Sequence, residues 1–233
     1  MSAIGAEADI GGYLSKNVES AIMCPMVSVL LEDRNLLFLH VPRTGGGAIS
    51  RLLRAEPDAK TYPVQNMSVA QPCVRQLSNQ LCKPMSEYRT VAFIRNPWDW
   101  TVSGYFHVTE NMPAYDKPPT FRDFVLGGWT GATTLHYPTK FTTPEAYVAY
   151  HTQITPWEHL FPSGQIVEID TLCAFENLER DARDIFGLKT QLPHVHRSKR
   201  AHYSRYFDDE MRVAIAQRHA DLIDRFGYVF VRT

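Results

Sequence analysis

Mainly apolar segments recur along this chain, and polar or helical stretches separate them. Residues 36–41, 90–94 and 165–169 are dominated by aliphatic and aromatic side chains, which is typical of strands buried on both faces of a sheet. A further apolar run at 26–31 precedes the polar segment 32–35, and the pair predicts a hairpin that leads into the strand at 36–41.

Apolar residues at helical spacing lie between these strands. The helix after the first core strand has Ile49, Leu52 and Leu53 on one face. Further helices are predicted at 69–81, from Pro97 onward, at 120–126, in pieces over 145–160, at 175–186 and at 208–225. Buried strands that alternate with helices indicate an α/β fold with a mostly parallel central sheet covered by helices on both faces.

The length of the chain suits one α/β domain, which we predict to span residues 1–233. Residues 1–25 are small, polar and glycine-bearing, and we expect them to form an N-terminal arm. The segment 105–150 contains many prolines, glycines and aromatic residues. Long irregular stretches in a compact domain often bind substrate, so we expect 105–150 to be a substrate-binding insertion.

The charges of the chain nearly cancel, with 24 lysines and arginines against 25 aspartates and glutamates. Such a balance does not favour a broad surface for nucleic acid or for an anionic membrane, so any anion site must be a local cluster of basic residues. No apolar run reaches the ~18 residues of a membrane span. We therefore expect a soluble, cytoplasmic protein without a membrane anchor.

The cysteine and histidine spacing does not favour a metal site. The four cysteines are widely spaced: Cys24, Cys73, Cys82 and Cys173. They form no C-x-x-C pair, which argues against both a zinc site and a disulfide framework. His194 and His196 lack an evident third ligand. We expect no metal, and free thiols in a reducing compartment.

A glycine-rich turn follows the strand at 36–41, where residues 42–47 read PRTGGG. Glycines let backbone N–H groups approach a phosphate, and the start of the next helix adds partial positive charge. Arg43 adds a full positive charge and a planar set of donors. The turn therefore predicts a phosphate site, although the Walker A pattern G-x4-G-K-[ST] is absent. The alternative is a glycine-rich turn that binds nothing.

A second basic position follows the strand at 90–94. Arg95 lies at its carboxyl end, which is where open α/β sheets bind ligands. Ser103 comes eight residues later, about two turns along the helix that starts at Pro97. The guanidinium group and the hydroxyl can therefore converge on a single phosphate. The alternative is an arginine that only caps the sheet and a serine that faces solvent.

Three segments together share the order and composition of the motifs of one known family. Residues 38–47 read FLHVPRTGGG, residues 91–103 read VAFIRNPWDWTVS, and residues 175–181 and 224–228 read FENLERD and DRFGY. They resemble, in turn, the 5′-phosphosulfate loop, the 3′-phosphate motif and the C-terminal half of the PAPS-dependent sulfotransferases, particularly the small carbohydrate-sulfotransferase type. PAPS is 3′-phosphoadenosine 5′-phosphosulfate.

The resemblance implies a P-loop nucleotide-kinase-like fold and a reaction. The reaction would move a sulfuryl group from PAPS to a hydroxyl, less readily an amine, of a small molecule or glycan, and would release PAP. The candidate nucleotide-binding residues are Arg43, Thr44, Gly45, Gly46, Gly47, Ala48, Arg95, Ser103, Arg197 and Lys199. Residues 43–48 would hold the 5′-phosphate, Arg95 and Ser103 the 3′-phosphate, and Arg197 and Lys199 would contribute from a loop that closes over the nucleotide.

The chain departs from the family at positions close to the chemistry. Arg43 stands where the family usually has lysine. Arginine keeps the positive charge, but it cannot act as a proton donor at working pH. Gly47 and Ala48 replace the usual hydroxyl residues, which leaves more of the phosphate binding to backbone amides. The place where relatives often carry Gly-His reads Gln-Asn, ending at Asn66. We predict His107 as the general base; the alternatives are Glu56, Glu110 and His136.

The acceptor and two alternative functions stay open. Trp129, His136 and Tyr137 are expected to line the acceptor pocket, which would suit a sugar, a phenol or a lipid alcohol equally. One alternative is a P-loop small-molecule kinase, which would need ATP and Mg²⁺. The other is a catalytically inactive sulfotransferase-like protein that binds a nucleotide or a partner.

Overall fold

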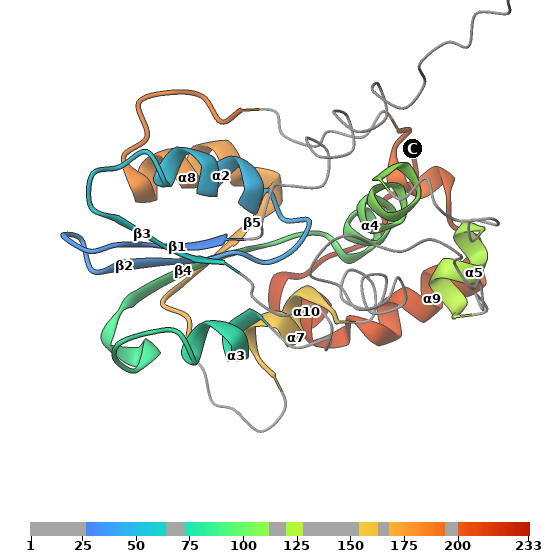
Figure 1. Cartoon of the computed structure of the whole chain (residues 1–233). Helices are drawn as coiled ribbons and strands as arrows, with labels where there is room; N and C mark the ends of the chain where they lie inside the picture. The colour runs from blue at the N-terminus through green and yellow to red at the C-terminus, as the bar shows by residue number, and fades with distance from the viewer. Residues whose placement is uncertain (1–26, 64–72, 112–119, 128–153, 163–167, 194–199) are drawn as a thin grey trace, which may run out of the picture.

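The computed structural model describes residues 27–63, 73–111, 120–127, 154–162, 168–193 and 200–233. In these residues five strands form one sheet with helices on both faces (Figure 1). The strands are β1 (Val27–Leu31), β2 (Leu36–Leu39), β3 (Ala59–Pro63), β4 (Arg89–Ile94) and β5 (Thr171–Ala174), and their order across the sheet is β3-β1-β2-β4-β5.

The sheet is mixed, and the prediction of a mostly parallel sheet is not confirmed. Strand β2 pairs with β4, and β4 with β5, in parallel, whereas β1 runs antiparallel to both β2 and β3. The reason lies in the short polar turn 32–35, where Asn35 takes the left-handed φ of 48°. A turn this short can join only antiparallel neighbours, so the predicted hairpin is confirmed and it reverses one strand.

Two strands differ from the sequence-based expectation. The strand predicted at 165–169 lies instead at β5, after Asp170, and residues 165–167 lie outside the described residues. Strand β3 was not predicted, because its five residues read AKTYP and include no buried position. Among the described strands it lies at the edge of the sheet and pairs with β1 alone, and such a strand carries little hydrophobic signal.

One face of the sheet is covered by α2 (Gly46–Leu53) and α8 (Leu178–Phe186) (Figure 1). Phe38 of β2 lies at the centre of this layer, with its ring edge-on to Phe93 and to Phe186. Helix α2 adds the buried side chains Ile49 and Leu53, as its apolar spacing predicted. The predicted end of the 175–186 helix at Gly187 is also confirmed, since Gly187 takes a φ of 68°.

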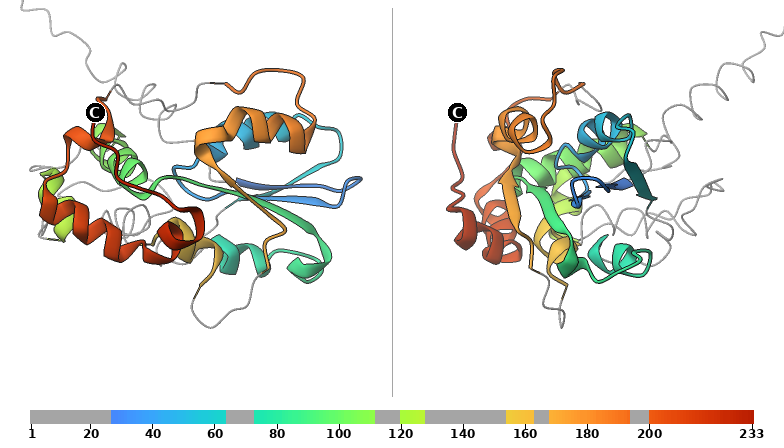
Figure 2. Two further views of the ribbon diagram at one scale, coloured as in Figure 1. Left: turned by 180° about the vertical axis from the view of Figure 1, so that it is seen from behind. Right: turned by 90° about the vertical axis from the view of Figure 1, so that its left-hand side faces the viewer.

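The opposite face is covered by α3 (Cys73–Ser78), α7 (Pro156–Leu160) and α10 (Ala220–Phe226). Leu37 and Leu39 of β2 point to this side and pack with residues of those helices: Val74, Leu77, Leu160 and Leu222. An end-on view shows the two helical layers on opposite sides of the sheet (Figure 2). Strands covered on both faces explain the unbroken apolar runs of the sequence.

A third packed group lies beyond the carboxyl end of β4. It consists of α4 (Pro97–Asn111), α5 (Phe121–Leu126) and α9 (Asp209–Arg218) (Figure 1). Its buried side chains come from all three helices: Trp98, Val102, Val125, Met211 and Ile215. The indole N–H of Trp98 also donates to the Arg212 carbonyl oxygen at 3.1 Å, which ties α4 to α9.

The helices predicted from sequence are present with altered bounds. The helix predicted at 208–225 is broken at His219 into α9 and α10. The helix predicted at 69–81 is observed over Cys73–Ser78, and that predicted at 145–160 over Pro156–Leu160, with residues 145–153 outside the described part. Three short 3₁₀ helices complete the described elements: η1 (Met85–Glu87), η2 (Phe175–Asn177) and η3 (Tyr203–Arg205).

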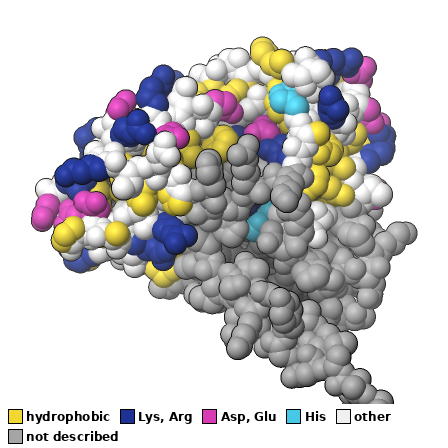
Figure 3. Space-filling view, turned by 90° about the horizontal axis from the view of Figure 1, so that it is seen from above, with side chains coloured by type: hydrophobic (Ala, Val, Ile, Leu, Met, Phe, Trp, Pro, Cys, Tyr) yellow, Lys and Arg dark blue, Asp and Glu magenta, His cyan; other side chains and the backbone are white. Residues whose placement is uncertain are grey.

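Within the described segments, no helix is both long and apolar enough to cross a membrane. The face above α2 and α8 shows basic and acidic side chains interspersed over the described surface (Figure 3). This arrangement agrees with the near-zero net charge of the chain.

The central position of Phe38 gives a prediction about stability. Its side chain is 1% exposed and contacts two other buried rings, so Phe38→Ala should lower the free energy of unfolding by about 3–5 kcal/mol. Urea unfolding followed by circular dichroism measures this loss. Val213→Ala is the control, because Val213 is 48% exposed and its truncation should change stability by less than about 0.5 kcal/mol.

Candidate functional site

The glycine-rich turn connects the carboxyl end of β2 to the start of α2. Two of its residues have a left-handed backbone, Arg43 with φ 62° and Gly45 with φ 83°. Glycine adopts this region freely, but arginine does so only at a cost in energy. Non-glycine residues held in this region cluster at functional sites, which singles out Arg43.

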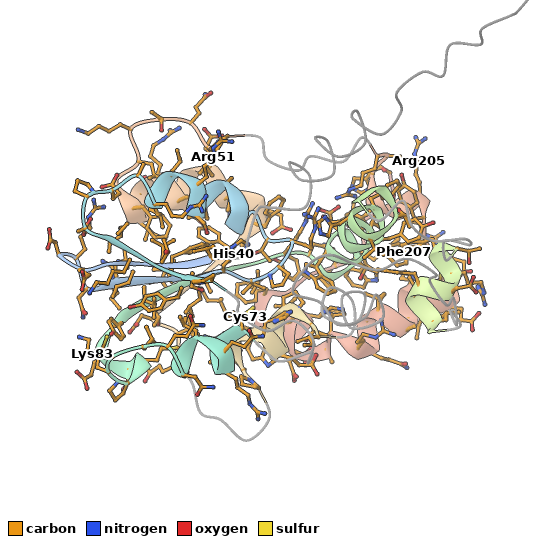
Figure 4. All side chains as sticks on the ribbon, viewed as in Figure 1. His40, Arg51, Cys73, Lys83, Arg205 and Phe207 are labelled. Carbon is orange, nitrogen blue, oxygen red and sulfur yellow. The ribbon has the colours of Figure 1, made fainter. Side chains whose placement is uncertain are left out.

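Two glycines of the turn are required by close packing. A Cβ atom on Gly46 would lie 2.3 Å from Cδ2 of His40, in a clash with the buried imidazole ring. A Cβ atom on Gly45 would lie 2.5 Å from a methyl carbon of Leu178, besides being strained by its φ. His40 lies beneath the start of α2 (Figure 4). The start of the helix is therefore pressed against the end of the sheet.

The start of α2 offers backbone donors to an anion. Gly45 is its N-cap and provides no side-chain cap, and the first amides of a helix have no partner one turn earlier. The amide of Ala48 is already used, since it donates to the Gly45 carbonyl oxygen at 3.0 Å. The buried hydroxyl of Thr44 donates to the Val41 carbonyl oxygen at 3.0 Å and braces the turn. The amides nearest the turn are thus the suitable phosphate donors.

The turn between β4 and α4 lies directly beside the glycine-rich turn. Arg95 follows β4, and its Nη1 donates to the main-chain oxygen of Arg43 at 3.1 Å. Its Nε donates to Oδ2 of Asp99 at 2.7 Å. Asn96 caps the helix, because its side-chain oxygen accepts from the amides of Trp98 and Asp99. The parallel pairing of β2 and β4 brings these two turns to the same edge of the sheet.

Ser103 meets Arg43 in this structure. The Nε and Nη2 atoms of Arg43 donate to the Ser103 hydroxyl oxygen at 3.2 and 3.0 Å. Arg95 contacts the same loop through the Arg43 carbonyl, so the three residues form one cluster. The indole N–H of Trp100 adds a buried hydrogen bond of 2.9 Å to the Pro42 carbonyl oxygen. Helix α4 thus contacts the glycine-rich turn at two points: Ser103 binds the Arg43 side chain, and Trp100 binds the Pro42 carbonyl oxygen.

A further group of contacts comes from the segment after β5. The guanidinium carbon of Arg95 lies 4.0 Å from the ring centroid of Phe175. Glu176 accepts from the Asn96 amide at 2.9 Å and from the Tyr228 hydroxyl at 3.0 Å. These contacts were not predicted from the sequence, because the third strand was placed at 165–169 and not directly before Phe175.

The basic segment 194–206, which precedes α9, contributes Arg200 to the candidate site. Arg200 donates from Nη2 to Oδ1 of Asp99 at 2.5 Å. The residues predicted from the sequence in this region, Arg197 and Lys199, both lie outside the described residues. Burial opposes the ionisation of Asp99, but the charges of Arg95 and Arg200 outweigh it and hold the pKa of Asp99 below its usual value.

The candidate general bases are only partly described. His107 is half-buried on α4, four residues and so one turn beyond Ser103. Glu56 forms an ion pair of 2.5 Å with Arg34 in the turn between β1 and β2. That turn is at the other end of β2 from the glycine-rich turn, so the suggestion that Glu56 faces the site was wrong. The remaining residues lie outside the described side chains: Asn66, Glu110, Trp129, His136 and Tyr137.

Two buried histidines border the site in the neutral state. Nδ1 of His40 accepts from the Val27 amide at 3.1 Å, and burial lowers the pKa of His40 to about 4. The ring of His219 lies 5.5 Å from that of Trp100, and neither of its nitrogens has a hydrogen-bond partner among the described residues. Burial lowers the pKa of His219 to about 3. Across the described residues, no group of three metal-ligating side chains is present.

Comparison with known proteins identifies the class to which this site belongs. The model of the sulfotransferase family matches residues 28–223, which include the turn after β2, the turn after β4 and the helices beyond them. The chain therefore belongs to the sulfotransferase family, a family of transferases. Neither the curated proteins nor the solved structures gave a match.

The two neutral histidines predict a pH dependence of stability. An unfolded histidine has a pKa near 6.5, so the unfolded chain binds more protons than the folded chain below that pH. Stability should therefore fall as the pH is lowered from about 6.5 toward 5, by up to about 1.4 kcal/mol per pH unit for each histidine.

Urea unfolding at several pH values measures this slope. His219→Leu should remove the contribution of one proton, and it breaks no hydrogen bond of the described structure. An unchanged slope in this variant would contradict the neutral, buried state of His219.

Proposed function

We propose that this protein transfers a sulfuryl group from PAPS to a hydroxyl, less readily an amine, of a small molecule or glycan and releases PAP. The observation that carries the proposal is the cluster of Arg43, Ser103 and Arg95 beside the start of α2. Two arginines, a hydroxyl and backbone amides suit a ligand with two phosphate groups. The proposed compartment is the cytoplasm, and a glycan or small molecule is the proposed partner.

Each part of the cluster has a role in this proposal. The amides of Gly45, Gly46 and Gly47, together with Arg43, bind the 5′-phosphate. Arg95 and Ser103 bind the 3′-phosphate. The hydroxyl oxygen of Ser103 accepts from Arg43, and its own hydrogen stays free to turn toward a phosphate oxygen. The contact between Arg43 and Ser103 is therefore compatible with both roles.

The chemical step depends on positioning and charge. PAPS supplies an activated sulfuryl group, whose sulfur bonds to the acceptor oxygen while its bond to the 5′-phosphate oxygen breaks. The electron pair of the broken bond stays on the phosphate, and Arg43 stabilises that growing negative charge. An arginine cannot release a proton at working pH, so its contribution is electrostatic. The acceptor proton passes to the base, for which His107 is the proposal.

Two alternatives predict different ligands. A P-loop kinase would bind ATP with Mg²⁺, but the lysine of the Walker A motif is absent from the turn. A catalytically inactive relative would bind PAP without consuming PAPS, and the replacement of hydroxyl residues by Gly47 and Ala48 is the feature that favours it.

Thermal unfolding with PAP, PAPS, ADP and ATP, each with and without Mg²⁺, separates these possibilities. A ligand at a hundred times its Kd adds about 2.7 kcal/mol of stability. We expect PAP and PAPS to stabilise the protein without metal, and to do so more than ADP or ATP. Stabilisation that needs ATP and Mg²⁺ would indicate the kinase, and release of PAP from PAPS with an acceptor would exclude the inactive relative.

Arg95→Ala should weaken PAP binding by about 2–5 kcal/mol, because a buried charge pair with the phosphate is lost. Isothermal titration calorimetry measures the change. The matched control is Arg122→Ala, which removes an arginine paired with Asp208 and Glu210 on the outer helices. This control should bind PAP as tightly as the unaltered protein. Equal PAP affinity in Arg95→Ala and the control would refute the assignment of Arg95.

A further inference from the structure

Asp99 lies in the first turn of α4 between two arginines from distant parts of the chain. Oδ2 accepts from Arg95 at 2.7 Å, and Oδ1 accepts from Arg200 at 2.5 Å. The side chains of both arginines are 11% exposed, and that of Asp99 is 20% exposed. These three residues, called here the arginine pair and its carboxylate, form a largely buried cluster at the edge of the candidate site.

The Asp99 carboxylate offsets the repulsion between the two arginines of this cluster. Two guanidinium groups brought close together repel each other, and partial burial strengthens that repulsion. Asp99 uses one oxygen for each arginine, so it neutralises one charge and fixes both groups against a common carboxylate. The cluster as a whole keeps a charge of +1, which favours an anionic ligand.

The orientation of Arg95 is fixed on several sides. Its Nε and Nη2 face Asp99, its Nη1 donates to the Arg43 oxygen, and its plane lies over the ring of Phe175. Each terminal nitrogen of a guanidinium group carries a second N–H, which these contacts do not use. Arg200 is similarly held through one terminal nitrogen. Donors therefore remain on both arginines.

We propose that Asp99 is a positioning residue, which holds Arg95 and Arg200 together so that both donate to the 3′-phosphate of the nucleotide. The inference rests on the proposed function, from which the ligand is taken, and adds Arg200 and Asp99 to the recognition of that phosphate. Asp99 does not touch the phosphate, because two anions in contact would repel. It acts through the two arginines.

This proposal predicts the opposite of simple electrostatics. Removal of a negative charge beside an anion site should, by charge alone, strengthen the binding of a phosphate. Loss of the common carboxylate should instead let the two arginines move apart, and the donors that read the 3′-phosphate would no longer be aligned. Weaker binding of the 3′-phosphate after loss of the Asp99 charge would therefore indicate a positioning role, and stronger binding would indicate an effect of charge alone.

The test compares PAP with AMP, which differs from PAP only by lacking the 3′-phosphate. The dissociation constants of both are measured by calorimetry for the full chain and for Asp99→Asn. We expect the preference for PAP over AMP to fall about tenfold or more in the variant. The affinity for AMP should fall much less than the affinity for PAP, because AMP has no phosphate at the arginine pair. Asp99→Glu keeps the charge and should recover part of the preference.

The matched control is Asp208→Asn. Asp208 likewise lies at the N-terminal end of a helix, as its N-cap, and its two oxygens accept from the Met211 amide and from Arg122, away from the candidate site. This variant reports the cost of losing a helix-capping carboxylate without disturbing Arg95 or Arg200. Its preference for PAP over AMP should equal that of the unaltered protein.

The possible outcomes separate this inference from the proposed function. If the unaltered protein shows no preference for PAP over AMP, the proposed donor is wrong and the inference is overturned with it. If the preference exists and Asp99→Asn keeps or increases it, only the positioning role is overturned. Arg200→Gln provides a second check, since its effect and that of Asp99→Asn should be less than additive when combined. Fully additive losses would also overturn the positioning role.

Discussion

The hydrogen bond from the Arg95 guanidinium group to the main-chain oxygen of Arg43 joins the two turns on which the candidate site depends. It can form because β2 and β4 are parallel neighbours, which places the residues after both strands at one edge of the sheet. The same contact supports Arg43 in its left-handed conformation. A single interaction thus links the strand pairing, the backbone of the glycine-rich turn and the basic side chains.

Helix α4 gives this arrangement its rigidity. Two of its residues contact the glycine-rich turn directly: Trp100 binds the Pro42 carbonyl oxygen, and Ser103 accepts from Arg43. Asp99 acts on the turn indirectly, because it holds Arg95, which donates to the Arg43 main-chain oxygen. The helix is in turn anchored to α9 through Trp98. Because a packed helix and a buried strand end hold these groups, the candidate site is already organised without a ligand, and less ordering would be required on binding.

Much of the fold could be predicted from hydrophobic patterning, and the exceptions have physical reasons. The strands β2 and β4 are buried on both faces and gave unbroken apolar runs, so they were found with nearly correct bounds. Strand β3 is a half-exposed edge strand, and β5 has no fully buried residue, so neither carried that signal. The candidate site could be predicted from the sequence where a single chain segment supplies its residues, as with Arg43 in the glycine-rich turn. Contacts such as Asp99 with Arg200 join residues 101 positions apart and depend on tertiary folding.

A crystal structure of the protein with PAP would show whether the two strand-end turns form one nucleotide site. We expect the 5′-phosphate at the amides of Gly45, Gly46 and Gly47 beside Arg43. We expect the 3′-phosphate within hydrogen-bonding distance of Arg95. PAP bound elsewhere, or bound at the glycine-rich turn with its 3′-phosphate away from Arg95, would contradict a single nucleotide site formed by both turns.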